Sequence, residues 1–402
     1  MLRFGYACGA VRVTTDERSE STGPRAHVVG FLNGLRAVGV DPRVYLAGDE
    51  APSSASRPGA GASLSRTAPQ RLASDLVRLG LRYGLRRRAV AKIGSVDVLY
   101  ERLATLQDIG RAFRRRGSCW VVESNGPFWY EAAEERKILA LVKTARRVEL
   151  DAYRDADLVV AVSESLKEII VRESGRREDD VYVLPNATDA VRFDPSLVTP
   201  TRLIAGPVIG FAGYMGEWAG LDNLIWALAR LQAAGRPLNA VLIGDGPARA
   251  ELERQAAREG VASVIRFTGN LPWGEMPSLL AGLDMAFSGQ RQMRIGAMYH
   301  SPQKIYEYQA MALPVIASDH VDARRLIGET NSGWLFDSDD RQGLLEALIA
   351  ARDDDSLVER GQRARRALLA SHTWTIRVEQ LLDELGRRDL FAHRASPDVR
   401  AA

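Results

Sequence analysis

Three polar residues in the C-terminal half have types and spacing suited to a phosphorylated ligand. Gln303, Lys304 and Glu307 fall in a stretch with helical character, where residues three and four apart are neighbours. This places a cation one turn from a carboxylate, near a helix N-terminus whose partial positive charge favours phosphate. A sugar nucleotide needs both, a positive potential for its diphosphate and an acceptor for its ribose hydroxyls. An ordinary amphipathic helix with a surface ion pair is the alternative interpretation.

The boundaries of this helix are predicted from its flanking residues. Ser301 suits the N-cap and Pro302 the first helical position, where a missing N–H costs nothing, and we expect both to take part in donor binding at this helix start. Pro314 ends the helix, and residues 315–317 form a short buried strand. Ala312 stands where a glycine usually closes such a helix, and alanine in a left-handed cap costs about 1 kcal/mol.

The whole stretch 301–319, SPQKIYEYQAMALPVIASD, resembles the nucleotide-sugar site of retaining glycosyltransferases of family 4. The resemblance extends over nearly the whole chain. It implies an α/β chain of the GT-B architecture, with two Rossmann-like domains whose parallel sheets face an interdomain cleft. It also implies a retaining hexosyltransferase that uses a nucleotide-diphosphate sugar, a UDP-sugar in our expectation, without a cofactor or a metal. In the family, the residues matching Lys304 and Glu307 hold the diphosphate and the ribose.

Length and composition fit this architecture. The chain has 402 residues, 46% apolar and 26% charged, as in a soluble protein of two domains. We expect an N-terminal acceptor-binding domain over residues 1–188 and a donor-binding domain over 204–372. Residues 373–402 are expected to form a helix that crosses back to the first domain, followed by a frayed tail.

Charge is distributed unevenly. Residues 1–185 carry 30 basic and 24 acidic side chains, a net +6, and the remainder of the chain carries −3. This favours an acidic acceptor or weak contact with an anionic membrane surface, and it is too small to indicate nucleic acid. The basic segment 71–92 is typical of membrane-surface helices, and also of a helix packed on a sheet with a solvated arginine face, which we favour.

The remaining composition points to the cytoplasm, with possible attachment to the inner face of the membrane left open. Cys8 and Cys119 fall in strands without metal-ligand spacing, so we expect two buried free thiols. No apolar run is long enough for a membrane span, and the N-terminus is expected to be a strand rather than a signal peptide. Asp155 and Asp157 could suggest a metal-binding pair, but a helix–strand turn explains them better.

Two segments of the N-terminal half are candidates for the acceptor side. Thr22 and Gly23 end a polar loop after the first strand, at the edge of an open sheet where ligands bind. In the family this loop closes over phosphates and acceptor. Glu123 and Asn125 follow a later strand in ESNGPFWYE, which resembles the family's E-x-N-x-P segment beside the transferred sugar, and the resemblance makes them our candidates for the catalytic residues. The aromatic residues 128–130 could stack on a sugar or lie in the core.

The C-terminal half opens with a strand and a glycine loop. Glycine lets the backbone approach a phosphate closely, which makes Gly213 and Gly244 candidates for donor binding. Tyr214 and Ala219 stand where the family usually has the Arg and Lys that bind the diphosphate. This departure weakens the expectation that the loop binds the diphosphate in the family's usual way. A branch of the family that has the motif W-x-G at this point is more similar to the chain, and Trp218 and Gly220 match that motif. Asn270 and Leu271 resemble the segment whose backbone reads the base.

Arg291 and Arg294 are candidates to replace the missing cations, because their loop directly precedes the helix that carries Lys304. The acceptor could be a glycan, a lipid-linked molecule or a small molecule, and the sequence does not distinguish these. A nucleotide-sugar isomerase or hydrolase on the same fold, and a non-catalytic sugar-nucleotide-binding protein, remain alternatives. A dehydrogenase is disfavoured, because GDGP lacks the full dinucleotide-binding fingerprint.

Overall fold

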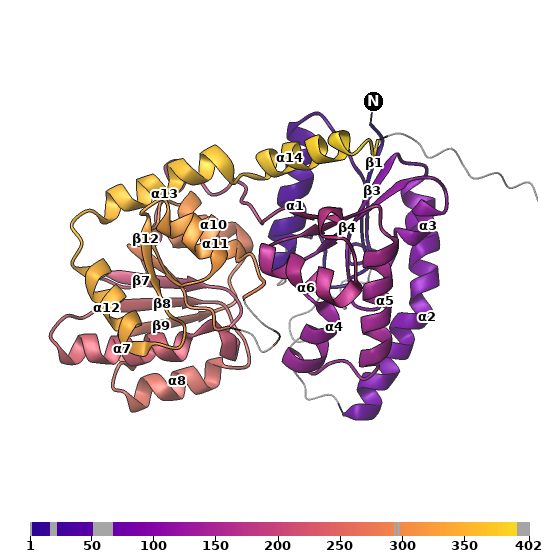
Figure 1. Cartoon of the computed structure of the whole chain (residues 1–402). Helices are drawn as coiled ribbons and strands as arrows, with labels where there is room; N and C mark the ends of the chain where they lie inside the picture. The colour runs from indigo at the N-terminus through magenta and orange to yellow at the C-terminus, as the bar shows by residue number, and fades with distance from the viewer. Residues whose placement is uncertain (1, 17–21, 51–66, 293–294, 296–297, 392–402) are drawn as a thin grey trace, which may run out of the picture. The chain divides into compact units, whose positions relative to one another are not determined.

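A computed structural model describes residues 2–16, 22–50, 67–292, 295 and 298–391 of the chain. The chain divides into two compact units. Unit 1 contains residues 1–186, the short segment Tyr299–Ser301 and residues from Trp374 onward, and unit 2 contains residues 187–298 and 302–373. Each unit is built around one parallel six-stranded sheet with helices in its connections (Figure 1). The prediction of two Rossmann-like α/β halves is therefore confirmed.

The sheet of unit 1 has the order β2-β1-β3-β4-β5-β6, and every pair is parallel. Its strands are β1 (Phe4–Cys8), β2 (Arg43–Leu46), β3 (Val98–Arg102), β4 (Cys119–Ser124), β5 (Leu158–Ala161) and β6 (Val181–Val183). The main helices are α1 (Thr22–Ala37), α2 (Ala68–Ile93), α5 (Val142–Asp155), α6 (Glu164–Ser174) and α14 (Trp374–Arg387). Strands β1, β3 and β4 are buried along their whole length, as expected for a sheet covered on both faces.

The sheet of unit 2 has the order β12-β11-β10-β7-β8-β9, again with parallel pairs. Its strands are β7 (Val208–Ala212), β8 (Asn239–Ile243), β9 (Ile265–Gly269), β10 (Met285–Ser288), β11 (Val315–Ser318) and β12 (Gly333–Phe336). The main helices are α7 (Leu221–Ala233), α8 (Arg249–Arg258), α9 (Met276–Ala281), α10 (Gln303–Ala310), α12 (Arg341–Arg352) and α13 (Leu357–Ser371). In both sheets the order reverses beside the first strand of the unit, and ligands of such folds bind at this point.

Helix α10 forms where the sequence indicated, but it begins later. Pro302 occupies the N-cap position, and no side chain caps the helix. The prediction that Ser301 is the N-cap is wrong, because its hydroxyl accepts a hydrogen bond from the backbone N–H of Asn186 at 3.1 Å. Ala312 has a φ of 57°, so the helix does close through a left-handed alanine.

Other expectations were met in part. Cys8 and Cys119 are buried free thiols, as predicted. The segment between β4 and β5 is not one continuous helix: a short helix, α4 (Phe128–Tyr130), continues into a π-helical turn, and α5 begins only at Val142. The first helix of unit 1 begins at Thr22, so the loop predicted to end at Gly23 gives way to helix sooner than expected.

The terminal helix α14 belongs to unit 1, where it packs on α1 beside the sheet (Figure 1). The two helices approach closely because α1 carries glycines at the contact. A Cβ on Gly30 would lie 2.1 Å from Nε1 of Trp374, and one on Gly34 would lie 2.7 Å from the Trp374 carbonyl oxygen. Trp374 itself is buried, and its ring meets the ring of His27 edge-on with centroids 4.7 Å apart.

Candidate functional site

Lys304 lies on the first turn of α10 and is directed toward the glycine loop that follows β7. Its Nζ lies 4.0 Å from the centre of the Phe211 ring and 5.9 Å from that of Trp218, as in cation–π contacts. A Cβ on Gly213 would lie only 3.4 Å from this Nζ. The ammonium is shielded from solvent and has no hydrogen-bond partner among the described residues. A buried cation without an acceptor is costly, which makes this atom the main candidate for binding an anion.

Glu307 follows Lys304 by one turn, and burial affects both groups. Desolvation lowers the pKa of Lys304 to about 7, although the nearby Glu307 carboxylate favours the charged amine. Desolvation also raises the pKa of Glu307 to about 8, against the opposing effects of Lys304 and a hydrogen bond from Gln303. Buried titratable groups with shifted pKa values are characteristic of functional sites. Tyr308, one residue on, is buried in the core, and its hydroxyl accepts a hydrogen bond from the N–H of Ala212 at 2.7 Å.

Two glycines shape the loop beside Lys304. Gly213 has a φ of 142° and Gly244 a φ of 122°, both strained for residues with side chains. A Cβ on Gly244 would lie 2.1 Å from the Gly213 carbonyl oxygen, so the two loops touch through backbone alone. These loops follow β7 and β8, which are neighbours in the sheet. The structure thus brings Gly213, Gly244 and Lys304 together, as the sequence suggested.

Arg291 does not lie free beside this loop. Its guanidinium binds the Asp222 carboxylate, with Nη2 at 2.6 and 2.8 Å from the two oxygens, and Nη1 donates to the Glu217 carbonyl at 3.2 Å. The hypothesis that Arg291 supplies a replacement cation is therefore not supported by its contacts. Arg294 lies outside the described residues. Among the predicted donor-site residues that the structure describes, Lys304 is the cation without a hydrogen-bond partner.

The other donor-site predictions fall on loops of unit 2. Tyr214 is half-exposed beside Gly213, while Ala219 is fully buried. Asn270 is exposed and Leu271 half-buried just after β9, the strand beside β8. Gly220 has a left-handed conformation, and a Cβ there would lie 2.0 Å from the Gly289 carbonyl oxygen. Trp218 and Gly220 of the W-x-G motif thus form the turn that leads into α7.

Glu123 lies buried at the end of β4 in unit 1, and its polar contacts are made through one carboxylate oxygen. Its Oε1 is 2.7 Å from His27 Nε2 and 2.9 Å from Arg102 Nη1, and it also accepts a hydrogen bond from Asn125 Nδ2. Burial favours the neutral acid, but His27 and Arg102 outweigh it and lower the pKa of Glu123 to about 2. The carboxylate is therefore ionised under ordinary conditions, and it cannot serve as a general acid.

Beside this cluster, residues 128–130 divide between core and surface. Phe128 is buried, and Arg146 lies over the Trp129 ring at 5.6 Å. The N–H groups of Phe128 and Trp129 donate to the buried Glu149 carboxylate, each at 3.0 Å. Burial raises the pKa of Glu149 to about 8 despite these hydrogen bonds and one from Tyr153. These hydrogen bonds fix the backbone of residues 128–130 to α5, which favours a structural role for the segment over stacking on a sugar.

Gly23 is exposed on the first turn of α1, next to Thr22, which starts the helix. Both lie on the connection that follows β1, and therefore at the carboxyl edge of the sheet, as predicted. Sequence reasoning missed His27, Arg102 and Asn186, which complete the Glu123 cluster. Arg102 ends β3 beside β4, so the order of the strands could have indicated it, whereas no local pattern marks His27.

No group of three or more His, Cys, Asp or Glu side chains in the described part of the chain is arranged to hold a metal ion. Within that same part, no helix has the length and apolar character needed to cross a bilayer.

Comparisons with known proteins agree with the fold. Residues 22–192 match the family model Glycosyltransferase Family 4, and residues 206–354 match the model Glycosyl transferases group 1. Among solved structures, sucrose-phosphate synthase from Thermosynechococcus elongatus superposes with a TM-score of 0.71 at 17% identity, covering 96% of this chain and 100% of the other. Anabaena Alr3699/HepE, in complex with UDP and glucose, gives 0.65 at 16% identity, with 96% and 100% covered. The chain therefore has the GT-B fold, and its two halves each match a glycosyltransferase family model.

Curated relatives match over shorter segments. The 2-deoxystreptamine glucosyltransferase of Streptomyces kanamyceticus is 32% identical over 146 residues, which are 34% of this chain and 38% of that protein. The GDP-mannose-dependent alpha-mannosyltransferase of Mycolicibacterium smegmatis is 28% identical over 194 residues, 46% of each chain. The chain thus spans less than half the length of these two relatives.

Proposed function

We propose that the chain transfers a hexose from a UDP-sugar to an acceptor hydroxyl with retention of anomeric configuration. The observation that carries this proposal is the buried, unpartnered ammonium of Lys304 beside the glycine loop, one turn before Glu307. Lys304 would pair with the diphosphate, and Glu307 would accept hydrogen bonds from the ribose. The UDP complexes of Alr3699/HepE support a nucleotide donor for this fold.

The reaction needs little chemistry from side chains. The acceptor oxygen forms a bond to the anomeric carbon as the bond from that carbon to the diphosphate oxygen breaks. The acceptor proton passes to the departing phosphate oxygen, so charge and atoms balance without a protein acid. Lys304 would stabilise the negative charge that develops on the diphosphate, which is the kind of preorganised electrostatic effect that lowers such barriers. Because Glu123 is ionised, its role in the proposal is to orient Asn125 and Arg102 at the carboxyl edge of unit 1.

Retention is tested on the isolated product. With an α-linked UDP-sugar, we expect the transferred sugar to be α-linked, because the 301–319 stretch resembles retaining enzymes. Proton NMR of the product gives the anomeric coupling directly. A β-linkage obtained from an α-linked donor would show that the mechanism inverts.

Release of UDP with and without an acceptor separates the proposal from its rivals. A transferase should release UDP faster when a productive acceptor is added, and the sugar should appear on that acceptor by mass spectrometry. A hydrolase or isomerase would consume the donor at the same rate without acceptor. Tight donor binding with no turnover across a broad acceptor panel would instead identify a binding protein.

The acceptor side of the proposal includes contact with an anionic membrane surface through α2. The outer face of α2 exposes five large apolar side chains, each between 41% and 67% accessible: Leu72, Leu76, Val77, Leu81 and Tyr83. A Cβ on Gly80 or Gly84 would meet nothing within 4 Å, so no residue that the structure describes covers this face at the two glycines. Such a surface, next to cations, is typical of helices that lie in the bilayer interface.

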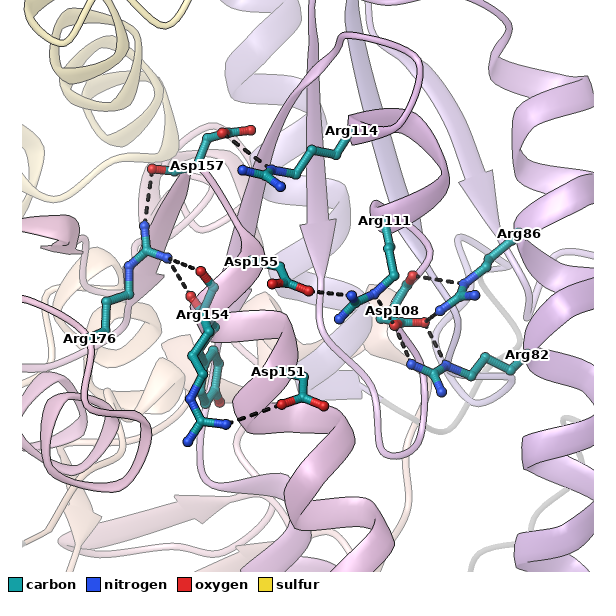
Figure 2. Close-up of polar contacts among 11 residues, drawn as sticks. Arg82, Arg86, Asp108, Arg111, Arg114, Asp151, Arg154, Asp155, Asp157 and Arg176 are labelled. Atoms are coloured by element: carbon teal, nitrogen blue, oxygen red, sulfur yellow. Dashed lines mark hydrogen bonds and ion pairs between the residues drawn. The ribbon is translucent and has the colours of Figure 1, made fainter. Parts of the chain in front are cut away.

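Charge on α2 supports an anionic partner over a second copy of the helix. Its acidic residue, Asp75, is buried and accepts hydrogen bonds from the backbone of Ala140 and Leu141. Arg82 and Arg86 turn inward to Asp108, as Figure 2 shows, whereas Arg87 and Arg88 are exposed. Two copies of this face would bring cations together, while a bilayer of anionic lipids would attract them.

We expect the protein to bind vesicles containing anionic lipid and to bind neutral vesicles weakly. Replacing Leu76 and Val77 by serine should weaken binding at least tenfold, since burying each such side chain contributes roughly 1.5–3 kcal/mol. The double change Arg87→Glu and Arg88→Glu should abolish the preference for anionic lipid. Val191→Ser removes an apolar residue of unit 2 that is 79% exposed and serves as the control. Co-sedimentation that is equal for parent and variants, or dimerisation through α2, would contradict the membrane contact.

A further inference from the structure

Two polar side chains at the carboxyl end of β10 have no hydrogen-bond partner among the described residues. Ser288, the last residue of the strand, is fully buried, and its Oγ is unpartnered. Gln290, two residues further on, is 6% exposed, and its Oε1 also lacks a partner. Buried polar groups in folded proteins are nearly always hydrogen-bonded, so each exception needs a physical explanation. A bound ligand can supply the missing partners.

The register of the sheet places Ser288 beside the loop of the proposed diphosphate site. Strand β10 pairs with β7 in parallel, and continuing the register of this pair places Ser288 level with Ala212. Neighbouring strands lie about 4.8 Å apart, so Ser288 is one strand spacing from the end of β7. Gly213, the next residue, lies so close to Lys304 that a Cβ on it would be 3.4 Å from Nζ.

Ser288 also faces the helix that carries Lys304. Successive side chains of a strand point to opposite faces of the sheet. Phe287 belongs to the apolar core that packs under α7, so Ser288 points to the other face. The connections β7–α7–β8 and β10–α10–β11 run in opposite directions across the sheet, and right-handed crossovers therefore place α7 and α10 on opposite faces. Ser288 and α10 thus lie on the same side of the sheet.

Backbone contacts hold Gln290 beside the turn that flanks Lys304. The N–H of the following residue donates to the Trp218 carbonyl oxygen at 2.9 Å. The carbonyl oxygen of the preceding Gly289 would lie 2.0 Å from a Cβ on Gly220. The chain is therefore fixed against residues 218–220 on both sides of Gln290. The Trp218 ring centre in turn lies 5.9 Å from Lys304 Nζ.

The other neighbour of β7 meets the glycine loop through backbone. The Gly213 N–H donates to the Ile243 carbonyl oxygen, and the Met215 N–H donates to the Asp245 carbonyl oxygen, each at 2.9 Å. These hydrogen bonds join the loops after β7 and β8 and satisfy their polar groups. The β10 side of Lys304 differs, because it presents polar side chains that the described residues leave unsatisfied.

We propose that Ser288 and Gln290 bind hydroxyl groups of the transferred hexose and thereby set the preference for one hexose over another. The inference rests on the proposed function, in which Lys304 pairs with the diphosphate and Glu307 with the ribose. The hexose is the other group bonded to the diphosphate, so it must lie next to Lys304, where these two side chains are placed.

The chemistry of the two side chains matches a sugar better than a phosphate. A diphosphate offers only acceptor oxygens to Gln290 Oε1, whereas a sugar hydroxyl supplies the proton that this atom lacks. The Ser288 hydroxyl can donate to a sugar oxygen or accept from a sugar hydroxyl. Both side chains are uncharged, as suits an uncharged hexose.

Isothermal titration calorimetry with UDP, UDP-glucose, UDP-galactose and UDP-N-acetylglucosamine separates hexose contacts from diphosphate contacts. Gln290→Met and Ser288→Ala should bind UDP as the parent does. The affinity for the best-bound UDP-hexose should fall roughly three- to tenfold in each, because one hydrogen bond between uncharged groups is lost. Gln290→Met should also narrow the difference in affinity between the best and the worst of the three UDP-hexoses.

Thermal unfolding without any ligand tests for a structural role. If neither group has a partner within the protein, replacing it by an apolar side chain breaks no hydrogen bond, so Tm should stay the same or rise. Gln232→Met is the matched control, because Gln232 is an exposed glutamine on α7 of the same unit. It should leave both Tm and all four affinities unchanged.

Three results would overturn the inference while the proposed function stands. They are equal losses of affinity for UDP and the UDP-hexoses, parental affinity of both variants for every UDP-hexose, and a marked fall in Tm in both variants. A parent protein that binds neither UDP nor any of the UDP-hexoses would instead overturn the proposed donor, and this inference with it.

Discussion

Replacing Lys304 by methionine is expected to weaken binding of a UDP-sugar by at least tenfold. The ammonium is buried against Phe211 without a hydrogen-bond partner among the described residues, so a diphosphate would supply its missing acceptor. A hydrogen bond to a charged group contributes roughly 1.5–3 kcal/mol, which corresponds to a factor of ten to a hundred. Methionine keeps a long apolar side chain over the ring and should preserve folding. Isothermal titration calorimetry with the intact nucleotide sugar measures the loss.

The pH dependence of binding gives a second readout for Lys304. The bound state needs a charged ammonium for the diphosphate and an ionised Glu307 for the ribose. With pKa values of about 7 for Lys304 and about 8 for Glu307, the free pair shares one proton between these limits. Below about pH 7 both groups are protonated, so donor binding must release the proton of Glu307. Above about pH 8 both have lost their protons, so binding must add one to Lys304. The affinity for the donor should therefore fall on both sides of this range. Lys304→Met should lose the alkaline limb.

Arg324→Met is the matched control, because Arg324 is an exposed cation of unit 2 that pairs with Asp319. Its affinity and pH profile should match those of the parent. Equal donor affinity in Lys304→Met and the parent would show that the buried ammonium does not contact the diphosphate. A cation outside the described residues would then have to bind the diphosphate, and Arg294 is the remaining predicted candidate.

The parts of the fold that were predicted correctly depend on local patterns. Helix α10 forms between Pro302 and Pro314, and Ala312 is left-handed because Pro314 prevents the helix from continuing. Each of these features is decided within a few residues, so the sequence alone indicates it.

The missed features depend on contacts between distant residues. Ser301 has the right type for an N-cap, but Asn186, 115 residues earlier in the chain, takes its hydroxyl instead. His27 and Asn186 are separated by 159 residues, so no local pattern predicts their contact. Arg291 looked like a free cation because its partner Asp222 lies 69 residues away. Pairing of polar groups over such distances is set by tertiary structure, which spacing along the chain does not reveal.

Glu307→Gln is expected to weaken binding of a ribonucleotide sugar by roughly ten- to a hundredfold. A carboxylate can accept two hydrogen bonds side by side, which matches the adjacent 2′ and 3′ hydroxyls of a ribose, whereas an amide replaces one acceptor by a donor. Loss of one charged hydrogen bond is worth roughly 1.5–3 kcal/mol. The change is nearly isosteric, and burial already raises the pKa of Glu307 to about 8, so the folded protein tolerates a neutral group there.

Two measurements make this prediction specific to the ribose. The loss should shrink with a 2′-deoxynucleotide sugar, which offers one hydroxyl fewer, and the acid limb of the pH profile should disappear because Glu307 no longer releases a proton. Glu346→Gln, a change at an exposed carboxylate on α12, is the control and should bind both donors as the parent does. If Glu307→Gln binds ribo- and deoxyribonucleotide donors with parental affinity, Glu307 does not hold the ribose. Its carboxylate would then serve only as the electrostatic partner of Lys304 on the first turns of α10.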